Sequence, residues 1–210
     1  MLVFFLSSTA LSQLGKNNAS KSVLRRIGKA GARDGTQVLA NGGVAAICAL
    51  AALSENPIWQ VAFVGAIAAA TADTWGTEIG ALQSTPPRSI LSGKHVATGL
   101  SGGVSLLGSA AELAGAVLLG AIAWSIHASP VFFAIVAGGF AGALVDSILG
   151  ASVQALRFCR GCGTFCESDP HHCGADTTLV RGAAWMTNDA VNLLSTAAGA
   201  AIAAAIYAVR

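Results

Sequence analysis

Charged side chains are scarce in this sequence. Only 10% of the 210 residues are Asp, Glu, Lys or Arg, whereas soluble proteins carry about 25%. Hydrophobic residues make up 54% of the chain, and the alternating pattern of membrane β-barrel strands is absent. The 25 glycines and the alanine-rich runs favour close packing of helices in lipid. The composition excludes an ordinary soluble domain and predicts an all-α, polytopic transmembrane helical bundle, with residues 1–210 forming one integral membrane domain.

Five apolar segments approach the length of about 20 residues that a membrane crossing requires. They run over residues 37–53, 58–82, 101–126, 131–153 and 183–209. The apolar segment from Met1 to Leu14 is too short to cross, and it lacks the basic start of a signal peptide. The sequence therefore predicts about five full spans plus a partial N-terminal helix.

Positive charges gather in three long loops. Eleven of the twelve Lys and Arg residues lie at about 15–34, 84–98 and 157–181, while the turns at 54–57 and 127–130 hold none. Loops that are rich in Lys and Arg stay on the cytoplasmic side of a membrane. The pattern predicts a bacterial or archaeal cytoplasmic-membrane protein whose three long loops are cytoplasmic.

The run Ala72-Asp73-Thr74-Trp75-Gly76-Thr77-Glu78-Ile79-Gly80 follows an almost wholly apolar stretch, and no Lys or Arg lies nearby to neutralise its two acids. Two further acids sit in similar apolar runs at the same predicted membrane face. Ionisable groups in a membrane are costly and usually functional, and Mg²⁺ prefers oxygen ligands. The alternative is that these acids form hydrogen bonds between helices. We expect a catalytic Mg²⁺ site on the cytoplasmic side, formed by Asp73, Glu78, Asp146 and Asp189.

Glu112 lies deeper in the predicted bilayer, on a helical stripe with Ser105 and Gly108. It is either a structural acid or a residue that reaches a ligand and orients it. On the last predicted helix, Asn188 and Asn192 belong to a polar stripe that must face the bundle interior. Such a stripe either binds ligand oxygens or supplies hydrogen bonds between helices.

Two Gly-Gly motifs are candidates for backbone phosphate binding. Glycines at the start of a helix leave N–H groups free to hold an anion, although helix packing is the commoner reason for such glycines. Neither motif is a Walker loop, because the Gly-Lys-Ser/Thr signature is missing. Each motif also leads into an out-and-back pair of helices, which suggests a parallel duplication. The predicted nucleotide- and phosphate-binding residues are Asn41, Gly42, Gly43, Arg88, Lys94, Ser101, Gly102, Gly103, Ser105, Asn188 and Asn192.

Cysteine and histidine cluster in the third loop. Disulfides are disfavoured in the cytoplasm, so the spacing indicates a metal site or free thiols. A tetrahedral site takes four such ligands, and its expected role is to brace the loop. Cys166 is an alternative to the histidine in the predicted structural Zn²⁺ site, which consists of Cys159, Cys162, His171 and Cys173.

These motifs together resemble the DUF92 family of integral membrane proteins, which includes the plant phytyl-phosphate kinase and the animal transmembrane protein 19. The resemblance covers nearly the whole chain. The sequence differs from the family pattern in two ways. Family members usually carry further helices before the Phe4-Phe5-x-Ser7-Ser8 segment, which here follows closely on Met1, and the Cys/His cluster resembles a feature of microbial members only. The matching motifs are Gln37-Val-Leu-Ala-Asn41-Gly42-Gly43, the Asp73 to Gly80 run, Pro87-Arg88, Gly99-x-Ser101-Gly-Gly-Val-Ser105, Asp146-Ser-x-Leu-Gly-Ala and Asn188-Asp189-x-Val-Asn192.

The resemblance implies a membrane kinase. Such an enzyme transfers a phosphoryl group from a nucleoside triphosphate, CTP by analogy, to a polyprenyl or phytyl monophosphate. The implied partners are the lipid monophosphate, the nucleotide, Mg²⁺ and the bilayer, with no nucleic acid; homo-oligomerisation stays open. The acids alone also fit an ion-coupled transporter, and the same metal and CTP would serve a cytidylyltransferase-like enzyme.

Overall fold

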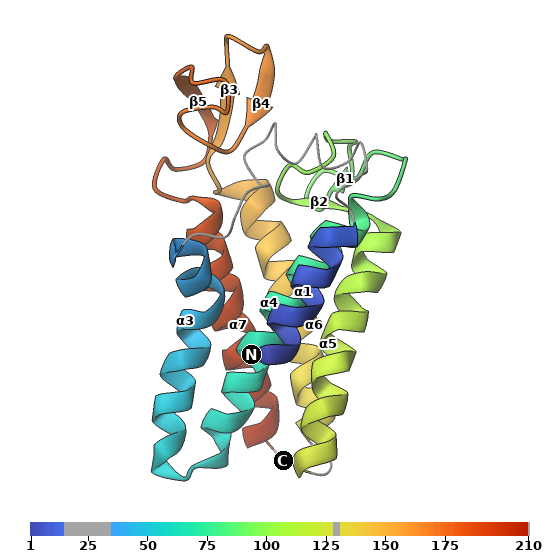
Figure 1. The fold of residues 1–210 in the computed structure, drawn as a ribbon, viewed down its shortest axis with the longest axis vertical. Helices are drawn as coiled ribbons and strands as arrows, with labels where there is room; N and C mark the ends of the chain where they lie inside the picture. The colour runs from blue at the N-terminus through green and yellow to red at the C-terminus, as the bar shows by residue number, and fades with distance from the viewer. Residues whose placement is uncertain (15–34, 128–130, 210) are drawn as a thin grey trace.

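The computed structural model describes residues 1–14, 35–127 and 131–209, in which long helices run side by side along one axis (Figure 1). The predicted loop at 15–34 and most of the turn at 127–130 lie outside these residues. The helices confirm the all-α membrane bundle. Their bounds are α1 Leu2–Leu14, α3 Gly35–Ala51, the short 3₁₀ helix η1 Ala52–Ser54, α4 Pro57–Gly80, α5 Leu106–His127, α6 Val131–Ser152 and α7 Asn188–Ala208.

Four helices in the described part of the chain are long and apolar enough to cross a membrane. They are Gly35–Ser54, Leu106–Ile126, Val131–Ser152 and Asn188–Ala208. The remaining predicted span, residues 58–82, corresponds to α4, which has 24 residues but is less apolar than these four. It lies at the centre of the bundle, in contact with α1, α3, α5, α6 and α7. Because protein rather than lipid surrounds α4, its polar residues are tolerated at membrane depth.

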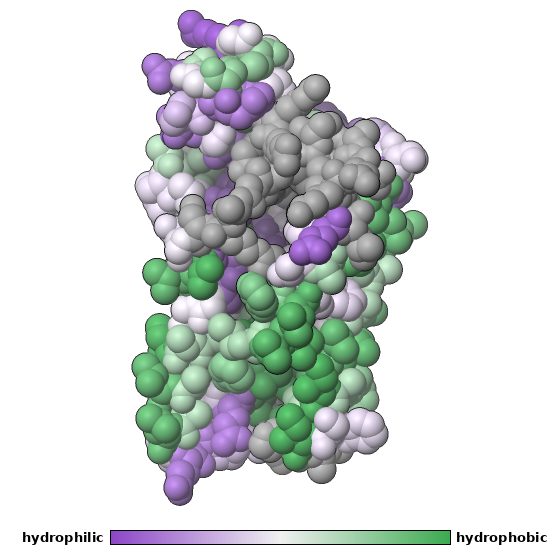
Figure 2. All heavy atoms as spheres, viewed as in Figure 1, coloured by the Kyte–Doolittle hydropathy of each residue, from purple (hydrophilic) through white to green (hydrophobic). Residues whose placement is uncertain are grey.

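Small residues allow α4, α6 and α7 to approach closely. A Cβ atom added to Gly142 of α6 would lie 2.5 Å from the Cβ of Ala69 on α4. One added to Gly199 of α7 would lie 2.6 Å from the same atom. Many larger apolar side chains are exposed, and the face that Figure 2 shows carries a hydrophobic surface over its lower part. This arrangement matches the small-residue packing of membrane helices.

Two predicted helix starts are wrong by five residues each. The helix expected from residue 101 begins at Leu106, because Gly103–Val104 form strand β2 and pair with strand β1, Arg88–Ser89. The helix expected from residue 183 begins at Asn188, where the Thr187 side chain accepts a hydrogen bond from the Ala190 N–H. In both cases the preceding residues form β-structure or turns in place of the first helical turn.

The loop between α6 and α7 folds into a three-stranded antiparallel sheet of order β4-β3-β5. Its strands are β3 Leu156–Cys159, β4 Thr164–Cys166 and β5 Thr177–Arg181. Both small sheets lie at the same end of the bundle, opposite the η1 turn (Figure 1). This end therefore carries the described basic residues of two predicted cytoplasmic loops, which are Arg88, Lys94, Arg157, Arg160 and Arg181.

The orientation of the bundle can be tested with a matched pair of exposed serines. Ser92 lies in the loop after β1 and Ser54 lies in the turn at the opposite end. Because Lys and Arg keep loops in the cytoplasm, we expect a membrane-impermeant maleimide to label Ser92→Cys in inverted vesicles and Ser54→Cys in intact cells. Labelling is compared with that of the parent protein, whose own exposed thiols set the background. The reverse pattern would overturn the orientation.

Candidate functional site

Two adjoining cavities lie at the end of the bundle that carries the sheets. The glycine cavity, of about 70 Å³, is bordered by α4, α5, α6 and the turn before α5. The acidic cavity, of about 260 Å³, is bordered by α3, α4, α6 and α7. Three side chains line both cavities: Asp73, Thr77 and Asp146.

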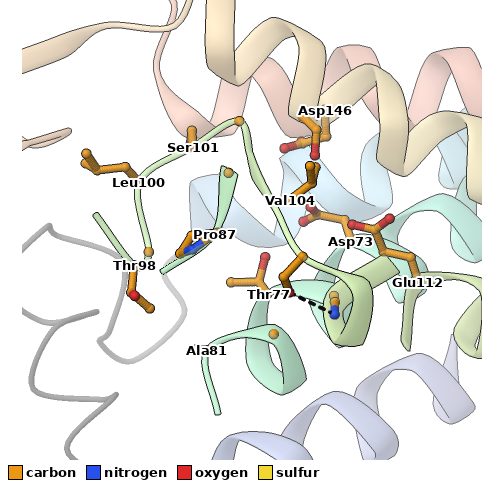
Figure 3. Close-up of a pocket in the computed structure, with 18 residues that line it drawn as sticks. Asp73, Thr77, Ala81, Pro87, Thr98, Leu100, Ser101, Val104, Glu112 and Asp146 are labelled. Atoms are coloured by element: carbon orange, nitrogen blue, oxygen red, sulfur yellow. Dashed lines mark hydrogen bonds between the residues drawn. The ribbon is translucent and has the colours of Figure 1, made fainter. Parts of the chain in front are cut away.

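Asp73 and Asp146 lie at the junction of the two cavities. Asp73 comes from α4 and is half-buried, while Asp146 comes from α6 and is 9% exposed. Figure 3 shows both carboxylates near the space that the turn before α5 encloses. The close packing of α4 on α6 brings together two acids that are 73 residues apart in the sequence.

The other two predicted metal ligands line only the acidic cavity. Glu78 is one turn beyond Asp73, and the Ser12 hydroxyl of α1 donates a hydrogen bond to its carboxylate. Asp189 lies in the first turn of α7. The predicted amides Asn41, Asn188 and Asn192 line the same cavity. The structure thus gathers all four predicted acids and all three predicted amides, from α3, α4, α6 and α7, around one space.

The N-terminal helix α1 packs along α4 beside this site. The Trp75 indole N–H donates to the Ser7 hydroxyl at 3.2 Å, while Ser12 contacts Glu78 further along the helix. Both partners on α4 belong to the distinctive run from Asp73 to Gly80. The Phe4-Phe5-x-Ser7-Ser8 segment therefore helps to position that run.

Glu112 joins the site in the structure, although the sequence left its role open. It is 7% exposed and lines the glycine cavity with Asp73 and Asp146. A Cβ atom on Gly76 would lie 2.5 Å from Glu112 Cγ and 2.7 Å from Oε1, so this glycine makes room for the Glu112 side chain. The buried Oε2 atom of Glu112 has no hydrogen-bond partner among the described residues. An oxygen of this kind suits a ligand that enters the cavity.

The Ser101-Gly102-Gly103-Val104-Ser105 segment lines the glycine cavity as a turn rather than as the start of a helix. Gly102 has φ 81°, and a Cβ atom on it would lie 2.5 Å from the Cα of Ala151 at the end of α6. The Ser101 N–H donates to Oε1 of Glu167 at 2.6 Å, and the Ser101 hydroxyl donates to Oε2 at 2.9 Å. The turn does hold an anion, and that anion is a carboxylate of the protein itself.

Four of the predicted phosphate contacts do not line either cavity. Gly42 and Gly43 lie inside α3, where helical hydrogen bonds occupy their N–H groups, so the prediction of a free Gly-Gly turn there is wrong. Arg88 and Lys94 are exposed on the loop around β1, and Arg88 donates to the carbonyl of Gly93 at 2.9 Å. The two Gly-Gly motifs also differ in structure, which removes their support for a duplication.

Sequence reasoning missed several polar residues of the site. Thr77 was within reach of prediction, because it lies four residues after Asp73 and therefore on the same helix face. Glu167 carries no such signal, since it comes from the loop between α6 and α7. The polar residues that line a cavity without having been predicted are Gln37, Thr74, Thr77, Thr98, Ser147, Glu167 and Thr187.

The residues present fit a hard divalent cation. Their donors are carboxylate, hydroxyl and amide oxygens, which Mg²⁺ prefers, and no Lys or Arg among the described residues lines either cavity. The acids border one space without forming a tight ligand group like that of the cysteines. Mg²⁺ commonly takes one or two protein carboxylates plus substrate oxygens and water. The position of Asp73 and Asp146 makes them the central pair of the four predicted ligands.

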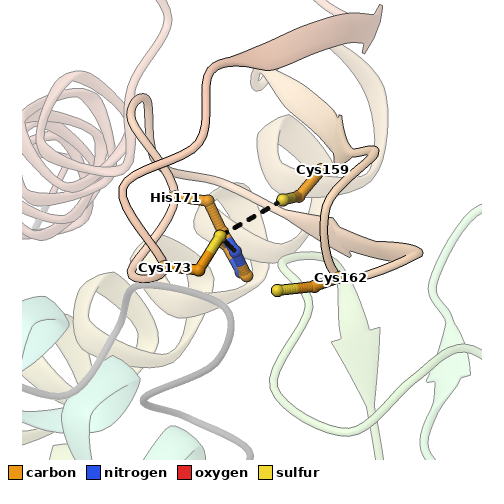
Figure 4. Close-up of side chains that lie close together, drawn as sticks. All are labelled: Cys159, Cys162, His171 and Cys173. Carbon is orange, nitrogen blue, oxygen red and sulfur yellow. Dashed lines mark hydrogen bonds between the residues drawn. The ribbon is translucent and has the colours of Figure 1, made fainter.

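The predicted zinc ligands converge in the lobe between α6 and α7. Ligand atoms of Cys159, Cys162, His171 and Cys173 all lie within 4.8 Å of one another (Figure 4). A hydrogen bond from the Ala175 backbone, with help from His171, lowers the pKa of Cys173 to about 6. A hydrogen bond with Cys173 raises the pKa of Cys162 to about 11. The alternative ligand Cys166 is not in the group, and its Sγ lies 3.7 Å from the Ser168 carbonyl oxygen.

An apolar helix bundle with acids gathered at one end defines a polytopic membrane protein with a polar site at one membrane face. The chain belongs to the DUF92 family, since the family model "Integral membrane protein DUF92" matches residues 1–200. It is 30% identical to Protein PGR of Arabidopsis thaliana, over 76% of this chain and 65% of that protein. It is also 30% identical to an uncharacterized membrane protein of Methanocaldococcus jannaschii, over 72% and 62% of the two chains. The chain thus spans under two thirds of each relative, and no solved structure matches it.

Proposed function

We propose that this protein is a membrane-embedded phosphotransferase. It transfers a phosphoryl group from a nucleoside triphosphate, with CTP the first candidate, to an isoprenoid monophosphate. The observation that carries the proposal is the set of acids around two joined cavities, without a Lys or Arg of the described residues in their walls. A divalent cation bound by these carboxylates would offset their repulsion of an anionic substrate. Bound Mg²⁺ would supply the charge neutralisation that phosphoryl transfer requires.

The residues of the chain have distinct roles in this proposal. Asp73 and Asp146 would hold the metal, and Glu78 and Asp189 would add negative charge beside it from the acidic cavity. Asn188 and Asn192, which line the same cavity from α7, donate hydrogen bonds to phosphate or sugar oxygens. Phosphoryl transfer depends mainly on positioning and electrostatics rather than on covalent protein chemistry. A rigid site on packed helices suits that requirement.

An apolar groove supports a lipid substrate. It has a volume of about 560 Å³ and lies between α1, α4, α5 and α6, with Val61, Val64 and Ile67 of α4 in its wall. Ile67 precedes Asp73 by six residues, so the groove begins about 9 Å below the acids along α4, at the helical rise of about 1.5 Å per residue. A lipid whose phosphate sits at the acids would keep its tail at groove depth, inside the bilayer.

A product assay tests the proposal. Purified protein in detergent receives Mg²⁺, phytyl or geranylgeranyl monophosphate, and each nucleoside triphosphate in turn. Formation of nucleoside diphosphate and lipid diphosphate is the expected result. Pyrophosphate with a nucleotide-linked lipid would instead identify a cytidylyltransferase-like enzyme. A folded protein without turnover would overturn the proposal, and ion flux in liposomes would then test the transporter alternative.

A further inference from the structure

The four predicted zinc ligands have distances close to those of a formed site. Zinc–thiolate bonds of about 2.3 Å in tetrahedral geometry place two sulfurs about 3.7 Å apart. The Sγ atoms of Cys159 and Cys173 are 3.6 Å apart, and His171 Nδ1 is 3.3 Å from Cys173 Sγ. The ligands thus already converge without a metal, and three thiolates with one imidazole are a common donor set for structural zinc.

The surroundings of His171 also suit a metal ligand. His171 is 2% exposed, and its second ring nitrogen, Nε2, lies 2.9 Å from Nδ1 of the exposed His172. Histidine ligands usually use their other ring nitrogen in a hydrogen bond that fixes the ring. His171 can therefore present Nδ1 to a metal while His172 holds the far side of its ring.

Apart from these ligands, a small sheet and a few polar contacts hold the lobe, among them two hydrogen bonds that Thr177 donates to Asp169. Its sheet strands have three to five residues, and its phenylalanines form one edge-to-face pair, Phe158 with Phe165. One partly exposed ion pair, Arg157 with Asp169 at 2.7 Å, joins β3 to the loop that follows β4. Structures this small usually depend on a metal or on disulfides.

The lobe also reaches the membrane site through one side chain. Glu167 follows directly on β4, between the ligand pair Cys159–Cys162 and the pair His171–Cys173. Its carboxylate accepts hydrogen bonds from the Ser101 turn and, at 2.8 Å, from the amide of Gln154. A metal bound to both ligand pairs would tie together the chain segments before and after Glu167, and would thereby restrict the position of Glu167.

We propose that Cys159, Cys162, His171 and Cys173 bind one Zn²⁺ ion, and that this ion holds Glu167 against the Ser101 turn of the glycine cavity. The zinc lobe is thereby a part of the site rather than a separate appendage. Glu167 is a positioning residue, because it fixes the turn that borders Asp73 and Asp146. This inference does not depend on the proposed phosphoryl transfer.

The first test measures the metal. Protein purified without chelators is expected to contain one zinc per chain, and Co²⁺ in its place should give the visible absorption bands of tetrahedral cobalt thiolate. Cys162→Ser and Cys173→Ser should each lose most of the zinc. Cys166→Ser is the matched control, since this buried thiol lies in the same lobe outside the ligand group, and it should keep the metal. Wild-type protein that binds neither metal, or full zinc in both ligand variants, would overturn the site.

The second test measures the coupling by hydrogen exchange. Because hydrogen bonds to charged groups are among the stronger ones, the Ser101 amide should exchange at least about tenfold faster in Glu167→Ala, which keeps its zinc. The same acceleration is expected in Cys173→Ser and after zinc removal, but not in Cys166→Ser. Unchanged exchange after confirmed zinc loss would overturn the coupling. Acceleration in Cys166→Ser, with zinc still bound, would also overturn it.

Discussion

Asp73→Asn is expected to lower turnover in the phosphoryl-transfer assay by at least about 100-fold, the size of effect seen when one group that stabilises the transition state is removed. The substitution keeps the shape of the side chain and removes the negative charge at the junction of the two cavities. Because Asp73 is only half-buried on α4, the fold should remain intact. Initial rates at several Mg²⁺ concentrations, with thermal unfolding in detergent, measure both effects.

Glu55→Gln is the matched control for this variant. It makes the same change from carboxylate to amide at an exposed position in the turn at the opposite end of the bundle. Its turnover and Mg²⁺ dependence should equal those of the parent. Near-normal activity in Asp73→Asn would show that the acid at the cavity junction does not hold the metal.

Gly102→Ala is expected to be among the most destabilising single substitutions in the described part of the chain. Gly102 has φ 81°, a region that costs other residues about 1–3 kcal/mol. Its new methyl group would also lie 2.5 Å from Ala151 Cα, and overpacking costs about 1–3 kcal/mol more. A total of about 2–6 kcal/mol corresponds to a fall of at least about 4 °C in Tm for a chain of this size.

Gly93→Ala separates the two causes. Gly93 has φ 66°, but a Cβ atom on it would meet nothing within 4 Å. This variant should show the backbone cost alone, with a fall of about 2–4 °C in Tm for each 1 kcal/mol. Equal falls in Tm for Gly93→Ala and Gly102→Ala would mean that the close contact of the Ser101 turn with α6 contributes little to the destabilisation.

Much of the bundle was predictable because local composition decides whether a segment crosses a membrane. The apolar segments and the turn at Asn56-Pro57, where α4 starts, required no knowledge of distant contacts. The starts of α5 and α7 were missed because Gly103–Val104 pair with a strand that lies outside the helix, and because the lobe ends in a turn before Thr187. Those contacts leave no periodic pattern in the sequence from which the helix starts could be predicted.

The acids of the site were predictable for a related reason. Asp73, Asp146 and Asp189 interrupt apolar runs, and an uncompensated acid at membrane depth is costly enough to indicate a function. The prediction for Arg88 and Lys94 rests on their positive charge and, for Arg88, on the Pro87-Arg88 motif, but the structure holds both on the exposed loop around β1. A basic residue that is close in sequence to a site residue need not have its side chain directed toward the site when it lies in a loop.

By itself the sequence determined the membrane class, the family and the acids of the site, because these depend on composition and on residues that stand out locally. Only the tertiary structure decided that Asp73 and Asp146 share the glycine cavity with Glu112, and that Gly42 and Gly43 belong to a helix interior. Only it placed Glu167 on Ser101. These relations depend on how segments that are distant in the sequence pack together. The sequence around a polar loop residue does not indicate which backbone N–H groups its side chain will contact.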